Sequence, residues 1–145
     1  MAGETIQLVV VTPAKQLLRR NVTEVTLPGA GGCLGVLPGH APLITELGIG
    51  ELNYRDADGK DSETLSIIRG FAEVLANRVT LLAETAEFAA EIDLARAEAA
   101  KARAEKRLAA GDANIDWDRV SVALQRALIR IQVARKHRGV LSETR

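Results

Sequence analysis

The feature that most constrains the fold of this chain is a change of pattern near Glu87. Before this point, turn-forming residues interrupt the sequence every few positions, and the segments between them are long enough for strands but too short for ordinary helices. After it, an alanine-rich, charged stretch runs from residue 93 to residue 108 without glycine or proline. The sequence therefore predicts an α+β chain, with strands in residues 1–88 and helices in residues 89–145.

The predicted strands are short segments that alternate apolar and polar side chains or are rich in β-branched residues. In residues 22–27, for example, Val25 and Leu27 share one face, as a half-buried antiparallel strand requires. We count about eight segments and expect some to split, which predicts an antiparallel β-sandwich or barrel. The segments are residues 6–11, 22–27, 34–37, 43–47, 50–54, 62–68, 71–75 and 79–82.

Two helices are predicted after the strands. Asp93 is a suitable N-cap for the first, and Gly111 stands just past its end as a stop signal. Asp116 caps the second, which runs from Trp117 to about residue 137. Trp117 is expected to be a packing anchor, at the start of a stripe of apolar residues with helical spacing. The other members of the stripe are Val120, Leu124, Leu128 or Ala127, Ile131 and Ala134.

The first helix offers little apolar surface for packing. Its large apolar residues are Leu94 and Leu108, with Ala97, Ala100 and Ala104 between them. At about 25 cal/mol per Å² of buried apolar surface, an alanine contributes well under half as much as a leucine, so docking of the helical hairpin should be marginal. Alanine has the best intrinsic helix propensity, so both helices can persist when undocked. These properties suit a regulatory switch.

Composition and charge narrow the class of protein further. The 145 residues suit one domain with an appendage. Residues 1–90 carry 7 Lys/Arg against 11 Asp/Glu, a net charge of −4, whereas residues 91–145 carry 12 against 8, a net charge of +4. The basic part could seek an acidic partner surface. Cys33 is the only cysteine, which favours a reducing compartment, and residues 8–11 are too short for a signal peptide or a membrane span.

Several motifs resemble one family along nearly the whole chain and in the same order. They are G-V-L-P-G-H-A-P-L at 35–43, G-F-A-E-V at 70–74, N-R-V-T at 77–80, A-E at 83–84 and I-D-L-A-R-A at 92–97. In these segments the chain is similar to the ε subunits of bacterial rotary ATP synthases.

This resemblance implies a β-sandwich of about ten strands in residues 1–88, which contacts the rotor, and a regulatory two-helix hairpin in residues 89–145. It implies a non-catalytic subunit without a required cofactor, held peripherally on the cytoplasmic face of the bacterial cell membrane. Its expected partners are the γ subunit, the c-subunit ring and, through the helices, the catalytic β subunits. The subunit would help to couple proton flow to ATP synthesis and would restrain ATP hydrolysis.

The I-D-x-x-R-A segment is where some members of that family bind ATP as a regulatory ligand. By its match to the motif, the chain supplies Asp93 and Arg96. Arg103 returns to the same helical face two turns later, and guanidinium groups suit a triphosphate because they offer paired, permanently charged donors. The alternative is that Asp93 only caps a helix and that the arginines are solvated. Residues that could complete such a site are Glu87, Arg126 and Arg130.

The second helix also carries further basic residues, which the resemblance assigns to an acidic surface of the catalytic subunits. Nucleic-acid binding is disfavoured, because aromatic residues make up only 3% of the chain and none lies among these cations. A solvated helix face is the remaining alternative. The candidate contact residues, besides Arg126 and Arg130, are Arg119, Arg135, Lys136 and Arg138.

His40 lies in a loop bounded by glycine and proline that resembles the family's contact with the c ring, and a turn-filling role is the alternative. Cys33 occupies a place where relatives often carry a polar or acidic residue, so a ring contact that needs that side chain is in question. No arrangement of nucleophile and base or of metal ligands is legible, which disfavours an enzyme and a metal site. A free-standing ATP-sensing module that binds another acidic protein is the alternative function.

Overall fold

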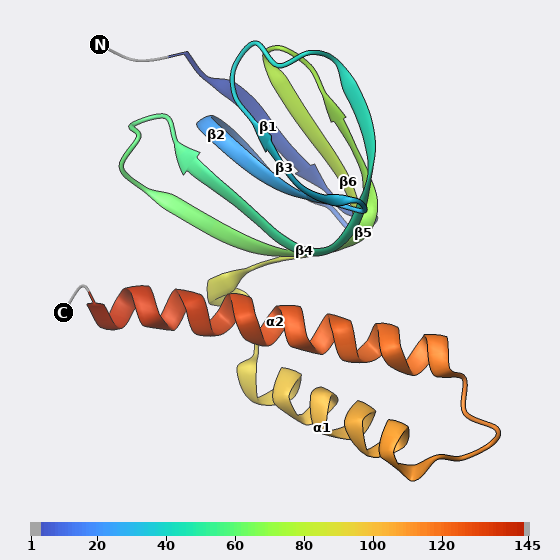
Figure 1. The fold of residues 1–145 in the computed structure, drawn as a ribbon. Coiled ribbons are helices and arrows are strands. Elements are labelled where there is room, and N and C mark those ends of the chain that lie inside the picture. The colour runs from blue at the N-terminus through green and yellow to red at the C-terminus, as the bar shows by residue number, and fades with distance from the viewer. Residues whose placement is uncertain (1–3, 144–145) are drawn as a thin grey trace. The chain divides into compact units, whose positions relative to one another are not determined.

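The structure is a computed structural model that describes residues 4–143, with side chains described as far as residue 139. The chain divides into two compact units, Met1–Phe88 and Ala89–Arg145. The first contains the strands and the second contains the helices (Figure 1).

The first unit contains six strands among the described residues. They form one sheet in the order β1-β6-β5-β4-β2-β3, and β1 also pairs with β2, which closes the sheet on itself. All pairings are antiparallel except the parallel pairing of β1 with β6. The strands are β1 (Ile6–Val11), β2 (Gln16–Gly29), β3 (Gly32–Val36), β4 (Leu43–Asp56), β5 (Ser62–Val74) and β6 (Arg78–Phe88).

The architecture of strands followed by a helical hairpin is confirmed, but the expected number of strands is wrong. The structure has fewer and longer strands than the eight or ten expected, because segments that the sequence separates run on as one. β4 continues through Gly48, and β5 continues through Gly70. The two strands keep one register on both sides of this point, since Leu47 pairs with Gly70 and Ile49 pairs with Ile68.

Gly70 sits where the backbones of β5 and β6 approach each other closely. Its φ of 133° lies in a region open almost only to glycine. A Cβ atom added there would collide with the carbonyl oxygen of Leu82 and would lie 2.9 Å from the Cα of Ala83. The glycine therefore allows β5 to stay continuous at a position where any side chain would force the strands apart.

The core of this unit consists of the inward-facing side chains of all six strands. In β1, Ile6, Leu8 and Val10 are fully buried and alternate with partly exposed residues. β5 supplies Leu65 and Ile67, within a run of four consecutive buried residues, 65–68. A continuous apolar interior of this kind gives the unit its own source of stability.

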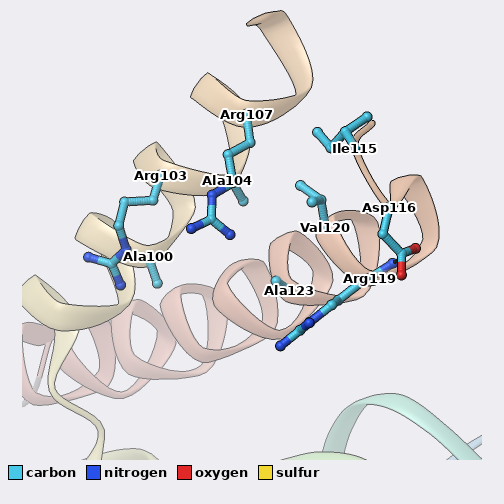
Figure 2. A pocket seen from close by; sticks show the side chains of 9 residues that line it. All are labelled: Ala100, Arg103, Ala104, Arg107, Ile115, Asp116, Arg119, Val120 and Ala123. Atoms are coloured by element: carbon cyan, nitrogen blue, oxygen red, sulfur yellow. Dashed lines mark hydrogen bonds between the residues drawn. The ribbon is translucent and has the colours of Figure 1, made fainter. Parts of the chain in front are cut away.

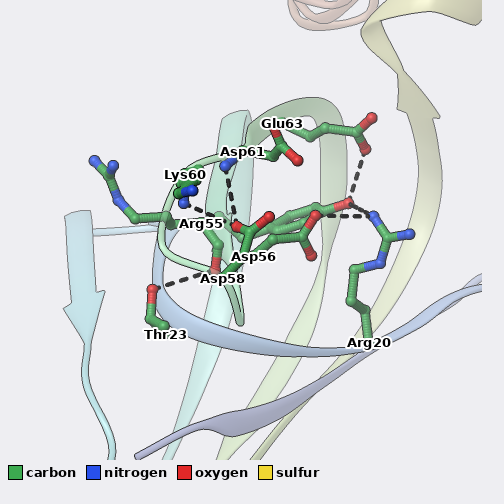
Figure 3. Close-up of polar contacts among 9 residues, drawn as sticks. Arg20, Thr23, Arg55, Asp56, Asp58, Lys60, Asp61 and Glu63 are labelled. Atoms are coloured by element: carbon green, nitrogen blue, oxygen red, sulfur yellow. Dashed lines mark hydrogen bonds and ion pairs between the residues drawn. The ribbon is translucent and has the colours of Figure 1, made fainter. Parts of the chain in front are cut away.

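A polar network ties together β2, β4 and β5 (Figure 3). The hydroxyl of Tyr54, a residue only 2% exposed, donates a hydrogen bond of 2.7 Å to Glu63 Oε2. Arg20 donates to the Tyr54 hydroxyl and to Asp56 Oδ2, each at 3.4 Å. Burial and the bond to Glu63 raise the pKa of Tyr54, so the hydroxyl remains a donor.

The second unit contains a short 3₁₀ segment, η1 (Ala89–Glu91), and the helices α1 (Leu94–Ala110) and α2 (Trp117–Glu143). The predicted caps are confirmed. Asp93 Oδ1 accepts a 3.0 Å hydrogen bond from the backbone N–H of Arg96, and Gly111 ends α1 with a φ of 64°. Asp116 Oδ1 likewise accepts a 3.1 Å bond from the N–H of Arg119. Within the described residues, neither helix is long and apolar enough to cross a membrane.

The two helices pack against each other with small side chains on α1 and both small and large ones on α2. Ala97 and Ala104 are the buried residues of α1, whereas the buried residues of α2 are Val120, Ala127, Ile131, Val133 and Ala134. The expectation that Trp117 anchors the packing is wrong, since its side chain is 53% exposed. The apolar spacing allowed either Leu128 or Ala127 at one position of the buried stripe. The structure buries Ala127 and leaves Leu128 exposed. The large buried side chains of the helix pair therefore come from α2, and α1 supplies small ones.

We expect the substitution Gly70→Ala to destabilise the first unit by at least about 2 kcal/mol, because it adds backbone strain and a collision with β6. The midpoint and slope of urea denaturation measure the change. Gly35→Ala is the matched control, since no atom lies within 4 Å of its Cβ position and its φ is not positive. Equal stability of the two variants would contradict the role given to Gly70.

Candidate functional site

A hollow of about 630 Å³ lies between the two helices at the end of the hairpin nearest its loop (Figure 2). Its apolar wall consists of Ala100 and Ala104 from α1, Ile115 from the loop, and Val120 and Ala123 from α2. The small size of the alanine side chains leaves this space open.

Three arginines line the same hollow. Arg103 and Arg107 reach from α1 toward α2, and Arg119 extends along α2 beside Ala123 (Figure 2). Among the described residues, none of the three arginine side chains forms an ion pair. Asp116 is the one acidic residue in the lining, and its Oδ1 already accepts the N–H of Arg119. The arrangement favours an anion, because three permanent positive charges face one carboxylate.

The arginines of the hollow belong to two rows with the same spacing. In α1 the row is Arg96, Arg103 and Arg107, and in α2 a row with the same intervals of seven and four residues is Arg119, Arg126 and Arg130. At 3.6 residues per turn, each member of a row points within about 20° of the row's mean direction around the helix axis. Each helix therefore carries one basic edge.

Five of the six residues predicted to bind ATP are distributed along the hairpin, and Glu87 belongs to β6. Of the six, Arg103 is the one that lines the hollow. Asp93 and Arg96 lie at the other end of α1, where the carboxylate of Asp93 caps the helix. Arg126 is exposed and Arg130 is half-buried on α2, and Glu87 is half-buried in β6.

The residues predicted to contact an acidic partner differ in their environments. Arg135 donates a 2.9 Å hydrogen bond to Glu98 Oε1, which links α2 to α1. Arg119 lines the hollow, whereas Lys136 and Arg138 are exposed on α2. Because the Arg135–Glu98 pair is largely exposed, it contributes at most about 1 kcal/mol to helix packing.

His40 lies in the loop between β3 and β4. Its Nδ1 is 2.7 Å from the carbonyl oxygen of Ala41, and its backbone N–H donates to the carbonyl oxygen of Leu37. Both contacts are local to the turn. Leu37 is itself 59% exposed, so the loop presents an apolar side chain beside the histidine. Cys33 is exposed on β3.

The outer face of the sheet carries an exposed apolar patch that the sequence did not single out. Phe71 and Leu82 pair directly across β5 and β6, and Ile44 lies diagonally from Phe71 across β4. Ile44 is 73% exposed, and Phe71 and Leu82 are each 57% exposed. Exposed apolar side chains gathered on neighbouring strands are typical of a protein interface. We refer to Ile44, Phe71 and Leu82 as the sheet patch.

Arg107 lines the hollow but was not predicted as a site residue. Its position could have been inferred from the sequence, because it follows Arg103 by four residues and so shares its helical face. The sheet patch could not be found in this way, since it depends on the register of three strands. Within the described part of the chain, no group of three or more His, Cys, Asp and Glu side chains is placed to hold a metal ion.

Both units match profiles of known protein families. Residues 5–89 match the β-sandwich domain of the ATP synthase delta/epsilon chain, and residues 90–135 match the long α-helix domain of the same chain.

Full-length relatives give the same result. The chain is 47% identical over 134 residues to the ATP synthase epsilon chain of Syntrophobacter fumaroxidans, covering 92% of this chain and 98% of that one. It is 46% identical over 136 residues to the epsilon chain of Syntrophomonas wolfei, covering 94% and 98% respectively.

Solved structures share the fold. A chain in the OSCP/F1/c-ring structure of the mitochondrial ATP synthase of Euglena gracilis matches with a TM-score of 0.76 at 23% identity, covering 88% of this chain and 79% of that one. A chain of the central stalk and c-ring structure from Tetrahymena thermophila matches with a TM-score of 0.52 at 16% identity, covering 63% and 72%.

Proposed function

This chain belongs to the family of ATP synthase delta and epsilon chains, and from this membership we propose that it is a rotor subunit seated on the central stalk of a proton-translocating ATP synthase. The observation that carries the proposal is the match of both units, in order, to the two domains of that chain. The alternative of a free-standing ATP sensor is not favoured, because relatives named as ATP synthase chains align over nearly their whole length.

The subunit is part of a membrane-associated complex. Within that complex its role is structural and regulatory, without catalysis of its own. It is held peripherally on the cytoplasmic face of a bacterial membrane by other subunits, without inserting into the bilayer itself and without binding nucleic acid.

The first unit supplies the contacts with the rotor. We assign the sheet patch to the γ subunit, because a rigid apolar surface on paired strands suits a permanent interface. The loop of His40, with the exposed Leu37 beside it, is assigned to the c-subunit ring.

The second unit supplies the regulation. The buried residues of α1 are the alanines Ala97 and Ala104, so this helix loses little apolar contact when it separates from α2. In the extended state the basic residues of α2 would reach the catalytic β subunits and restrain ATP hydrolysis. Arg119, Arg126, Arg130, Arg135, Lys136 and Arg138 are the residues that would make this contact.

ATP is proposed as the ligand that favours the compact hairpin, through Glu87, Asp93, Arg96, Arg103, Arg126 and Arg130. Support comes from the I-D-L-A-R-A motif at residues 92–97 and from the basic edges of both helices. Only a difference in affinity between the compact and extended states can shift the population. A low concentration of ATP would then release the helices.

Loss of an apolar side chain from the sheet patch should weaken the complex with γ. We expect Phe71→Ala and Leu82→Ala each to lower the affinity at least about tenfold, as truncation of a central apolar contact does. Binding of the purified chain to γ measures the change. Leu128→Ala, which shortens an exposed leucine of α2, is the matched control and should bind normally. Normal binding by both patch variants would remove the assignment.

Removal of the helices should release the restraint on hydrolysis. We expect a chain that ends at residue 91 to assemble with γ through the first unit, whose core is complete without the helices. The ATPase activity of the assembled enzyme should then exceed that with the full chain. If assembly is normal and activity does not change, the helices do not inhibit.

ATP binding can be followed through Trp117, the only tryptophan of the chain. We expect a saturable change of its fluorescence that Arg103→Ala weakens at least roughly tenfold, since a hydrogen bond to a charged group is worth about 1.5–3 kcal/mol. Asp93→Asn tests the carboxylate alone, because asparagine is an equally good N-cap. No fluorescence change together with no heat of binding in calorimetry would exclude ATP as a ligand.

A further inference from the structure

We propose that Arg69 is a binding residue for the γ subunit and that its guanidinium group pairs with a carboxylate of γ at the edge of the sheet patch. The inference rests on the proposed function, which assigns the sheet patch of Ile44, Phe71 and Leu82 to γ. It adds one charged residue to that apolar surface.

Arg69 has an unusual backbone conformation. Its φ is 53°, and among the residues that the structure describes it is the only one other than glycine with a positive φ. In this left-handed region the Cβ atom lies too close to the backbone, and arginine is not one of the residue types enriched there. The conformation therefore lowers the stability of the folded chain.

The fold needs the left-handed backbone at this position but does not need an arginine. The inward-facing residues of β5 on either side of it are Leu65, Ile67, Ala72 and Val74. Their numbers change from odd to even, so the alternation of a regular strand shifts by one residue between them. Glycine at position 69 would allow the same shift without steric strain. Since strain of this kind is concentrated at functional sites, we attribute the arginine to binding.

The guanidinium group of Arg69 is open to a partner. The side chain is exposed and forms no ion pair with another described residue. Glu84 occupies the position opposite Arg69 in the register of β5 and β6, yet no ion pair joins the two. A permanently charged group with paired N–H donors matches the geometry of a carboxylate.

Arg69 lies beside the sheet patch. Only Gly70 separates it from Phe71, so the two Cα atoms are roughly 7 Å apart along β5, and both side chains are exposed. The close approach of Gly70 to the backbone of β6 fixes this arrangement, because it involves the carbonyl oxygen of Leu82. A charge at the rim of an apolar contact gives specificity and speeds association.

The test measures, in the same variants of the full chain, both stability and affinity for the purified γ subunit. Arg69→Ala removes the guanidinium group and keeps the backbone strain, whereas Arg69→Gly removes both. We expect each variant to bind γ about tenfold more weakly. In urea denaturation, the folding equilibrium constant of Arg69→Gly should exceed that of Arg69→Ala at least about threefold. Because Arg69→Gly should also be at least as stable as the wild type, its weaker binding would not come from unfolding.

Two further variants and a control define the chemistry. Arg69→Glu should bind more weakly than Arg69→Ala, because it would repel the carboxylate of γ. Arg69→Lys keeps the charge without the paired donors and should bind with an affinity between those of the wild type and Arg69→Ala. Arg19→Ala is the matched control. Arg19 is an exposed arginine of β2, a strand that does not pair with β5, and it forms no ion pair with another described residue, so this variant should bind normally.

The outcomes separate this proposal from the proposed function. Normal binding by Arg69→Ala together with weak binding by Phe71→Ala would overturn the role of Arg69 and leave the sheet patch as the γ contact. Equal affinities of Arg69→Glu and Arg69→Ala would exclude a carboxylate as the group that Arg69 binds. Equal stabilities of Arg69→Gly and Arg69→Ala would remove the strain from which the role is inferred. Normal binding by both Phe71→Ala and Leu82→Ala would instead remove the assignment of the patch to γ.

Discussion

The pairing of β1 with both β2 and β6 is the interaction on which the first unit depends. β2 uses one edge for two partners, because its first half pairs with β1 and its second half pairs with β3. The parallel pairing of β1 with β6 then joins the beginning of the unit to its last strand. Without this closure, the edges of β1 and β6 would expose unpaired backbone groups. The closed sheet gives the sheet patch a rigid support, since Phe71 and Leu82 lie on strands paired on both sides.

Local signals explain what the sequence could predict. The ends of α1 and α2 follow from the caps at Asp93, Asp116 and Gly111, because capping involves residues only a few positions apart. The strands were miscounted because their lengths depend on distant partners. Gly70 resembles a break in the sequence, yet it keeps β5 continuous, since its lack of a side chain admits the backbone of β6.

The same distinction applies to the sites. Arg103 was predicted and lines the hollow, and its neighbour Arg107 could have been found from helical spacing alone. The arrangement with Arg119 required the loop geometry that brings the start of α2 beside the end of α1. The role of Trp117 was predicted wrongly because the spacing of apolar residues identifies the buried stripe of a helix but does not show where that stripe ends. Ala127 is buried on one stripe of α2 with Val120 and Ile131, whereas Leu128 and Trp117 lie outside this stripe and are exposed.

The buried alanines of α1, Ala97 and Ala104, lie on the same helix as the row of Arg96, Arg103 and Arg107. Arg107 and Arg119 line one hollow from opposite helices, where Ala104 and Val120 are the buried apolar residues of the wall. Leucines in place of Ala97 and Ala104 would add buried apolar area and hold α1 against α2 more strongly. With alanines, the contribution of α1 to the docking free energy is small, and the proposed binding of ATP by arginines of both helices would be comparable with it. Under the proposed function, alanine on α1 would therefore let the bound ligand shift the population between docked and separated helices.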